Sequence, residues 1–139
     1  MATFNKFNSF VEAVAEKAHN LGSDTLKVML TNSAPGASDT QKSDLTEISA
    51  GNGYTAGGTA ATISSSSQTS GTYKLVLADV VFTASGGTIG AFRYAVLYND
   101  TASNDELIGY WDYGSSITLA DGETLTVDFD ASAGVLTLA

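Results

Sequence analysis

One stretch of sequence decides the fold class: Ile117-Thr118-Leu119-Ala120-Asp121-Gly122-Glu123-Thr124-Leu125-Thr126-Val127-Asp128-Phe129. Its second half alternates, so that Leu125, Val127 and Phe129 face one side of a strand and polar residues face the other. The pair Asp121-Gly122 favours a type I′ turn, whose positive φ angles match the twist of paired strands. The stretch therefore predicts a β-hairpin that joins residues 117–119 to residues 124–129.

Short strand-like segments continue outward from this hairpin, separated by turn residues. One of them, residues 92–98, places Phe92, Tyr94, Val96 and Tyr98 on one face if the alternation is regular. At least six strands with only one helix predict a mostly β fold, a β-sandwich or flattened barrel of short antiparallel strands. The segments expected to form strands are 25–31, 60–67, 73–78, 80–84, 92–98, 107–113 and 135–138.

The N-terminal segment has the apolar spacing of an amphipathic α-helix. We expect this helix to begin near Thr3 to Asn5, to end at Gly22 as a C-cap, and to carry His19 in its last turn. It would cover one face or one end of the sheets. The apolar residues that recur at spacings of three and four are Phe7, Phe10, Val11, Val14, Ala18 and Leu21.

The length of 139 residues fits one domain, spanning residues 1–139. Within it we expect the helix over about 4–21, a long loop over about 32–58 with one helical turn, and a β-rich part over 59–139. A loop of that length inside a compact domain is uncommon unless it binds something or lies along a neighbour, so it hints at assembly.

The charge and composition argue against nucleic-acid partners, disulfide scaffolds and membrane insertion. Fifteen acidic and six basic residues give a net charge of −9, which disfavours binding to nucleic acid. The absence of cysteine excludes a disulfide scaffold. No apolar run reaches the roughly 20 residues of a membrane span, and the start lacks the pattern of a signal peptide. We expect a protein made in a cytoplasm that does not bind membranes.

Few residues have the types and spacing of an active site. His19 is the sole histidine, and no Gly-x-Ser-x-Gly elbow accompanies it. Asp128 and Asp130 share a strand face about 7 Å apart, as in some glycosidases, but alternating acids usually mark a solvated edge. These two residues, Asp112 and Asp121 could offer oxygen ligands to Ca²⁺, but no regular loop holds them together. We therefore predict no enzyme activity, no cofactor and no metal site.

One glycine-rich segment and one aromatic segment are candidate binding elements. The run 51–58 is rich in glycine but lacks the lysine of a phosphate-binding loop, so it predicts a flexible turn. On a strand, Trp111 and Tyr113 share a face and Tyr110 points to the other, so one aromatic side is a candidate for an interface. The candidate interface residues are Phe7, Phe10, Tyr54, Tyr110 and Trp111.

Four segments in fixed order resemble small structural proteins of tailed-bacteriophage virions. Together they extend over nearly the whole chain, and their order is more specific than any one of them. The resemblance carries over no catalytic residue. The segments are Ser23–Thr31, Gly53–Gly58, Phe92–Thr101 and Leu107–Gly114.

The resemblance implies a virion part, and the class most compatible with it is a decoration or cement protein on the outer surface of the capsid. Its partners would be the major capsid protein, copies of itself, or both, with the long loop and the helix as contacts, and it would be made in the cytoplasm of the host bacterium. The alternatives are a tail or neck protein, or a carbohydrate-binding module that stacks sugars on Trp111 and Tyr110.

Overall fold

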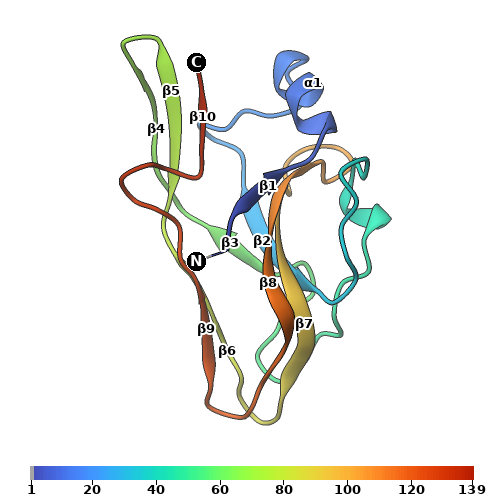
Figure 1. Cartoon of the computed structure of the whole chain (residues 1–139). Coiled ribbons are helices and arrows are strands. Elements are labelled where there is room, and N and C mark those ends of the chain that lie inside the picture. The colour runs from blue at the N-terminus through green and yellow to red at the C-terminus, as the bar shows by residue number, and fades with distance from the viewer. Residues whose placement is uncertain (1) are drawn as a thin grey trace.

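The computed structural model describes residues 2–139, and these form two packed layers of antiparallel strands with one short α-helix at one end (Figure 1). The larger layer is a sheet in the order β1 (Phe4–Lys6), β8 (Leu107–Leu119), β7 (Ile89–Asn99), β2 (Leu26–Thr31) and β3 (Thr59–Ala61). The second layer contains β10 (Leu136–Leu138), β5 (Thr72–Leu77) and β4 (Ile63–Thr69), followed by the pair β6 (Val80–Thr83) and β9 (Thr124–Val127). The predicted mostly β, sandwich-like fold is confirmed.

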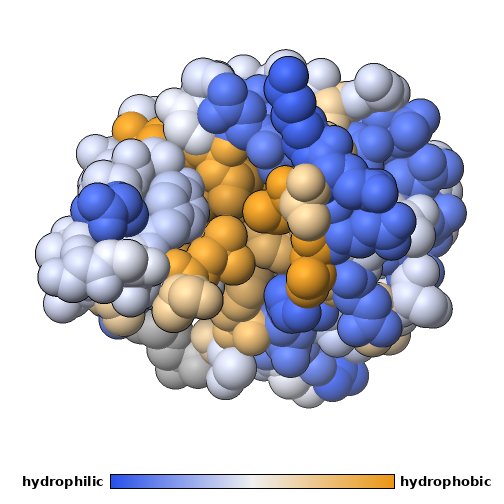
Figure 2. Space-filling view, turned by 90° about the horizontal axis from the view of Figure 1, so that it is seen from above, coloured by the Kyte–Doolittle hydropathy of each residue, from blue (hydrophilic) through white to orange (hydrophobic). Residues whose placement is uncertain are grey.

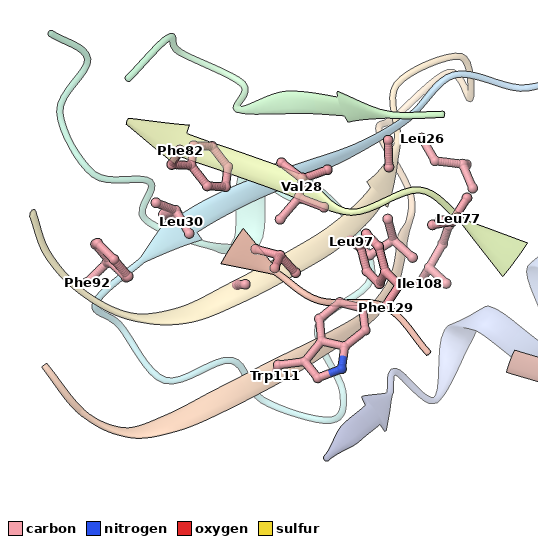
Figure 3. Packing of buried hydrophobic residues seen from close by; sticks show 14 of the residues in the cluster. Leu26, Val28, Leu30, Leu77, Phe82, Phe92, Leu97, Ile108, Trp111 and Phe129 are labelled. Carbon is pink, nitrogen blue, oxygen red and sulfur yellow. The ribbon is translucent and has the colours of Figure 1, made fainter. Parts of the chain in front are cut away.

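The main core lies between the two layers (Figure 3). Val28 of β2 and Leu97 of β7 are fully buried there, together with Phe82 of β6 in the opposite layer. The ring of Trp111 meets that of Phe129 edge to face, with 5.4 Å between the ring centroids. Burial of this apolar surface, at about 25 cal/mol per Å², is the main force that holds the layers together.

A second, smaller core covers the outer face of the larger sheet. Met29, Val96 and Tyr98 point to this side and are fully buried under Phe7 and Leu45. The central strands are therefore buried on both faces, as the apolar run in β2 predicts.

The long loop supplies part of that cover, and it is attached to its own sheet. It contains the predicted helical turn, a 3₁₀ helix η1 (Lys42–Asp44). Its backbone forms hydrogen bonds with β2 and with β8. The Ile48 amide donates to the Leu30 carbonyl of β2, and the Leu107 amide of β8 donates to the Thr40 carbonyl. The length of the loop is thus explained by intramolecular packing.

The predicted N-terminal helix is shorter than expected. Helix α1 covers only Ser9–Ala15, and residues 4–6 form strand β1, which pairs with β8. Pairing with an open strand edge overrides the helical spacing, so Phe7 and Phe10 enter different cores. The helix ends at Glu16, not Gly22, and the chain reverses through Lys17 at φ 68°, so His19 lies in the following loop.

The predicted hairpin is wrong in its pairing. Strand β8 pairs with β7, and β9 pairs with β6 in the other layer. The turn at Asp121-Gly122 exists, with the Glu123 amide donating to the Ala120 carbonyl, but only Gly122 has a positive φ. A type I′ turn needs two such residues, so this turn carries the chain across the sandwich. The predicted inward positions of Val127 and Phe129 are confirmed.

The alternation predicted for residues 92–98 is interrupted. The register of β7 against β8 shifts between Phe92 and Tyr94, where the partner residue on β8 changes from Ile117 to Asp112, so the pairing is irregular at this point. Phe92 therefore lies in the core between the layers, whereas Val96 and Tyr98 lie in the outer core. Trp111 and Tyr110 fall on opposite faces of β8 as predicted.

Candidate binding groove at the helix end of the sandwich

The end of the sandwich that carries α1 has an open groove of about 670 Å³. The β4–β5 hairpin and β10 extend along one side of this end, and α1 with the loops after it lies on the other (Figure 1). Seen from above, this end shows an apolar patch with strongly hydrophilic atoms on one side of it (Figure 2). Val14, Leu21, Tyr73 and Leu138 contribute apolar side chains to the lining.

One wall of the groove is formed by the β10-β5-β4 sheet of the second layer, whose strand ends extend beyond the larger sheet. Leu138 lies directly opposite Tyr73 in the β10–β5 pair, and the Tyr73 hydroxyl lies 2.8 Å from the Ser66 hydroxyl of β4. Leu75, two residues further along β5 from Tyr73, is fully buried in the main core. The groove therefore continues the interlayer core into solvent, and Leu138 is 41% exposed there.

The opposite wall is held by polar contacts around Asn99, at the end of β7. The Asn99 carboxamide oxygen accepts the Thr101 and Ala102 amides at 3.0 and 3.2 Å. Its nitrogen must then be the donor, and it donates to Asp24 Oδ2 at 2.7 Å and to His19 Nδ1 at 3.0 Å. This one side chain joins the loop between α1 and β2, which contains His19 and Asp24, to the loop between β7 and β8.

The same geometry fixes the tautomer of His19. Because Nδ1 accepts a hydrogen bond, the proton of the neutral ring is on Nε2. Nε2 is buried and has no partner among residues 2–139. Burial lowers the pKa of His19, and the carboxylates of Glu106 and Asp24 oppose this shift only in part. The ring also packs 5.4 Å from that of Phe10, between centroids.

The groove carries two carboxylates that form no ion pair within residues 2–139. Asp24 and Glu106 both line it, and none of the three ion pairs found within residues 2–139 includes either. Lys17, also in the lining, is exposed. Because His19 is neutral at neutral pH, the two carboxylates make this wall electrostatically negative.

A second polar cluster fastens the long loop to the larger sheet, away from the groove. The Tyr54 hydroxyl accepts the Leu30 amide at 3.0 Å and donates to Glu47 Oε1 at 2.7 Å. Glu47 Oε1 also accepts the Gly57 amide at 2.6 Å, and the Tyr98 hydroxyl donates to the Gly57 carbonyl at 2.6 Å. Burial raises the pKa of both tyrosines, so the hydroxyls stay protonated as donors.

The structure places most predicted interface residues in the interior. Phe7, Phe10, Tyr54 and Trp111 are at most 9% exposed, so their side chains present almost no surface in this conformation. Only Tyr110 is half-buried, next to Tyr94 on the outer face of β8. The glycine-rich run forms a turn at Asn52-Gly53 that delivers Tyr54 to the core.

Trp111 does reach a second, smaller hollow of about 530 Å³, together with Tyr113, Asp112 and Asp128. Asp112 is engaged by Arg93, whose Nε donates at 2.8 Å, and this contact lowers the pKa of Asp112. Binding of a sugar here stays a prediction.

Asp130 and Asp121, two of the four acidic residues considered as catalytic or metal-binding groups, accept backbone amides. Asp130 accepts the Ser132 and Ala133 amides at 2.8 Å each, which lowers its pKa, and Asp121 accepts the Gly86 amide at 2.9 Å. Residues 2–139 contain no group of three His, Asp or Glu side chains placed to hold a metal ion. Over the same residues, no helix is long and apolar enough to cross a membrane.

The sequence patterns do not indicate that the groove residues form a binding surface. Leu138 and Tyr73 belong to strands that were predicted, but a strand pattern does not say which strand end extends beyond the opposite layer. Leu138 is exposed in the structure, but an apolar residue in a strand pattern gives no sign of that exposure in the sequence.

The chain matches no protein family, no curated protein and no solved structure with which it was compared.

Proposed function

We propose that this chain is a non-enzymatic structural protein of a tailed-phage virion, a decoration or cement protein that binds the outer surface of the capsid. The observation that carries the proposal is the resemblance of four ordered segments to such proteins. In the fold, three of these segments contain β2, β7 and β8, which are neighbours in the larger sheet.

The fourth segment is joined to the same unit. It contains Tyr54, which bonds to the Leu30 amide of β2, and Gly57, whose carbonyl accepts the hydroxyl of Tyr98 of β7. Four stretches far apart in sequence therefore form one contiguous structural element. This supports the interpretation that the four segments resemble virion proteins as one structural unit and not as four independent matches.

The charge supports a place outside the shell. A net charge of −9 is unfavourable beside packaged DNA, but on the outer surface it keeps particles apart. A protein that binds only the assembled shell stabilises that state by mass action, by about 2.7 kcal/mol per site at a free concentration one hundred times the dissociation constant. The function is then mechanical and requires no chemistry.

Co-sedimentation with purified particles tests this function. The protein is mixed with DNA-filled heads and, separately, with tails of the same phage, and the pelleted protein is measured by gel densitometry. We expect many copies bound per head and a higher temperature of head disruption. Absence of binding to heads would refute the decoration function.

A tail or neck protein that assembles into rings is the second candidate, and the open strand edges favour it. The outer edges of β4 and β10 have no strand partner within residues 2–139, and unpaired edges can add strands between subunits. This candidate predicts self-association without heads. Sedimentation velocity of the purified protein would detect it, and a monomer at all concentrations would refute it.

A further inference from the structure

We propose that the groove at the helix end is the contact site for the capsid, and that it receives a segment of the shell protein that carries an apolar side chain flanked by lysine or arginine. This inference rests on the proposed function and names the surface and the partner chemistry for it.

The apolar part of the argument is the continuity of the groove with the core. Leu138, Tyr73 and Leu21 line a hollow that leads directly into the interlayer core. Solvent-exposed apolar surface of this kind is unfavourable, and burying it against a partner recovers about 25 cal/mol per Å². The volume of 670 Å³ is large enough for several side chains.

The electrostatic part of the argument is the unpaired acidic wall. Asp24 and Glu106 lie in the lining without an intramolecular ion pair, so a cationic side chain entering the groove would meet two carboxylates. The basic residues in the lining are His19, whose pKa burial lowers, and exposed Lys17, which is in none of the three ion pairs found within residues 2–139. An acidic partner segment would be repelled by the same wall and by the net charge of −9.

Polar contacts around Asn99 give this wall a fixed shape. Asn99 joins the loop between α1 and β2, through Asp24 and His19, to the loop that follows β7, through the amides of Thr101 and Ala102. A preformed groove lowers the entropy lost on binding, which favours a rigid docking site over an adaptable one.

Two matched variants test the groove. Leu138→Asp places a charge in the groove, and Val81→Asp places the same charge on the other large exposed residue of the second layer, 51% exposed on β6 and outside the groove lining. We expect Leu138→Asp to weaken head binding by about tenfold or more and Val81→Asp to change it less than about twofold. Both changes are at exposed sites, and circular dichroism checks the fold.

Two further measurements address the partner. Binding of the wild type should weaken as salt is raised from 50 to 300 mM, and Glu106→Gln should make this dependence shallower. A photo-crosslinking amino acid at position 138 should attach to the shell protein, whereas the same group at position 81 should not. The crosslink also reports on the groove if Leu138→Asp fails to fold.

The outcomes separate the two proposals. Failure of the wild type to bind heads would refute the decoration function. Wild-type binding that Leu138→Asp leaves intact, with no crosslink from position 138, would refute the groove as the contact while the function stands. Crosslinking of position 138 to a second copy of this chain would also overturn the groove proposal. Binding that strengthens with salt would refute the basic partner segment.

Discussion

Replacing Tyr54 by phenylalanine should remove the main polar attachment of the long loop without changing the ring. The hydroxyl accepts the amide of Leu30, which is fully buried, and donates to Glu47. An orphaned buried amide costs about 1–3 kcal/mol, and the lost bond to a partly exposed carboxylate adds about 1 kcal/mol, since Glu47 keeps the Gly57 amide. The expected loss of unfolding free energy is about 2–4 kcal/mol.

Urea unfolding followed by the fluorescence of Trp111, the only tryptophan, measures this loss. A loss of about 3 kcal/mol lowers the urea midpoint by about 1–3 M for slopes of about 1–3 kcal/mol per M. The matched control is Tyr110→Phe, a half-buried tyrosine whose hydroxyl makes no side-chain hydrogen bond recorded for residues 2–139, with an expected change below about 0.5 kcal/mol. If Tyr54→Phe unfolds within about 0.5 kcal/mol of the wild type, the hydroxyl does not fasten the loop.

Three further changes probe other parts of the structure. Leu97→Ala, at a fully buried site in the main core, should cost about 2–5 kcal/mol in urea unfolding. Gly58→Ala should destabilise more than Gly71→Ala: both glycines have positive φ, but a Cβ at Gly58 would overlap the Val28 carbonyl whereas Gly71 is open, so equal losses would contradict the close approach. Burial lowers the pKa of His19 in the folded protein. As the pH is lowered, His19 therefore becomes protonated in the unfolded chain, near pH 6.5, before it becomes protonated in the folded protein. His19 therefore contributes stability that is complete above pH 6.5 and lost as the pH falls toward its folded pKa; NMR of this single histidine should show the low pKa, and His19→Gln should remove its share of the pH dependence.

Local sequence patterns predicted most of the strands but not which strands pair with one another. The alternation in residues 124–129 predicted which side chains face inward, because burial on one face enforces a period of two. The partner of that strand could not be predicted from Asp121-Gly122, because a turn of similar composition can either pair its flanking strands or carry the chain between layers. The choice depends on β6, which lies more than 40 residues earlier in the chain.

The N-terminal segment shows a second limit. Its spacing satisfied a helix from about residue 4 to 21, but residues 4–6 pair with the edge of β8, which no local pattern reports. The candidate interface residues were chosen for aromatic character, and aromatic character favours burial at least as strongly as binding. The exposure of Leu138 depends on where the opposite layer ends, which no local pattern reports.

The cluster that fastens the long loop and the groove proposed for binding consist of different residues, so their contributions can be measured separately. Tyr54, Glu47 and Tyr98, which fasten the loop, do not line the groove, and the groove residue Leu138 contributes no hydrogen bond to that cluster. At temperatures where the variant remains folded, Tyr54→Phe should therefore bind heads as the wild type does although it unfolds in less urea. Leu138→Asp should show the reverse, with near-normal unfolding and weak binding. Parallel loss of both properties in both variants would show that the loop and the groove act as one unit, because only coupled sites change together.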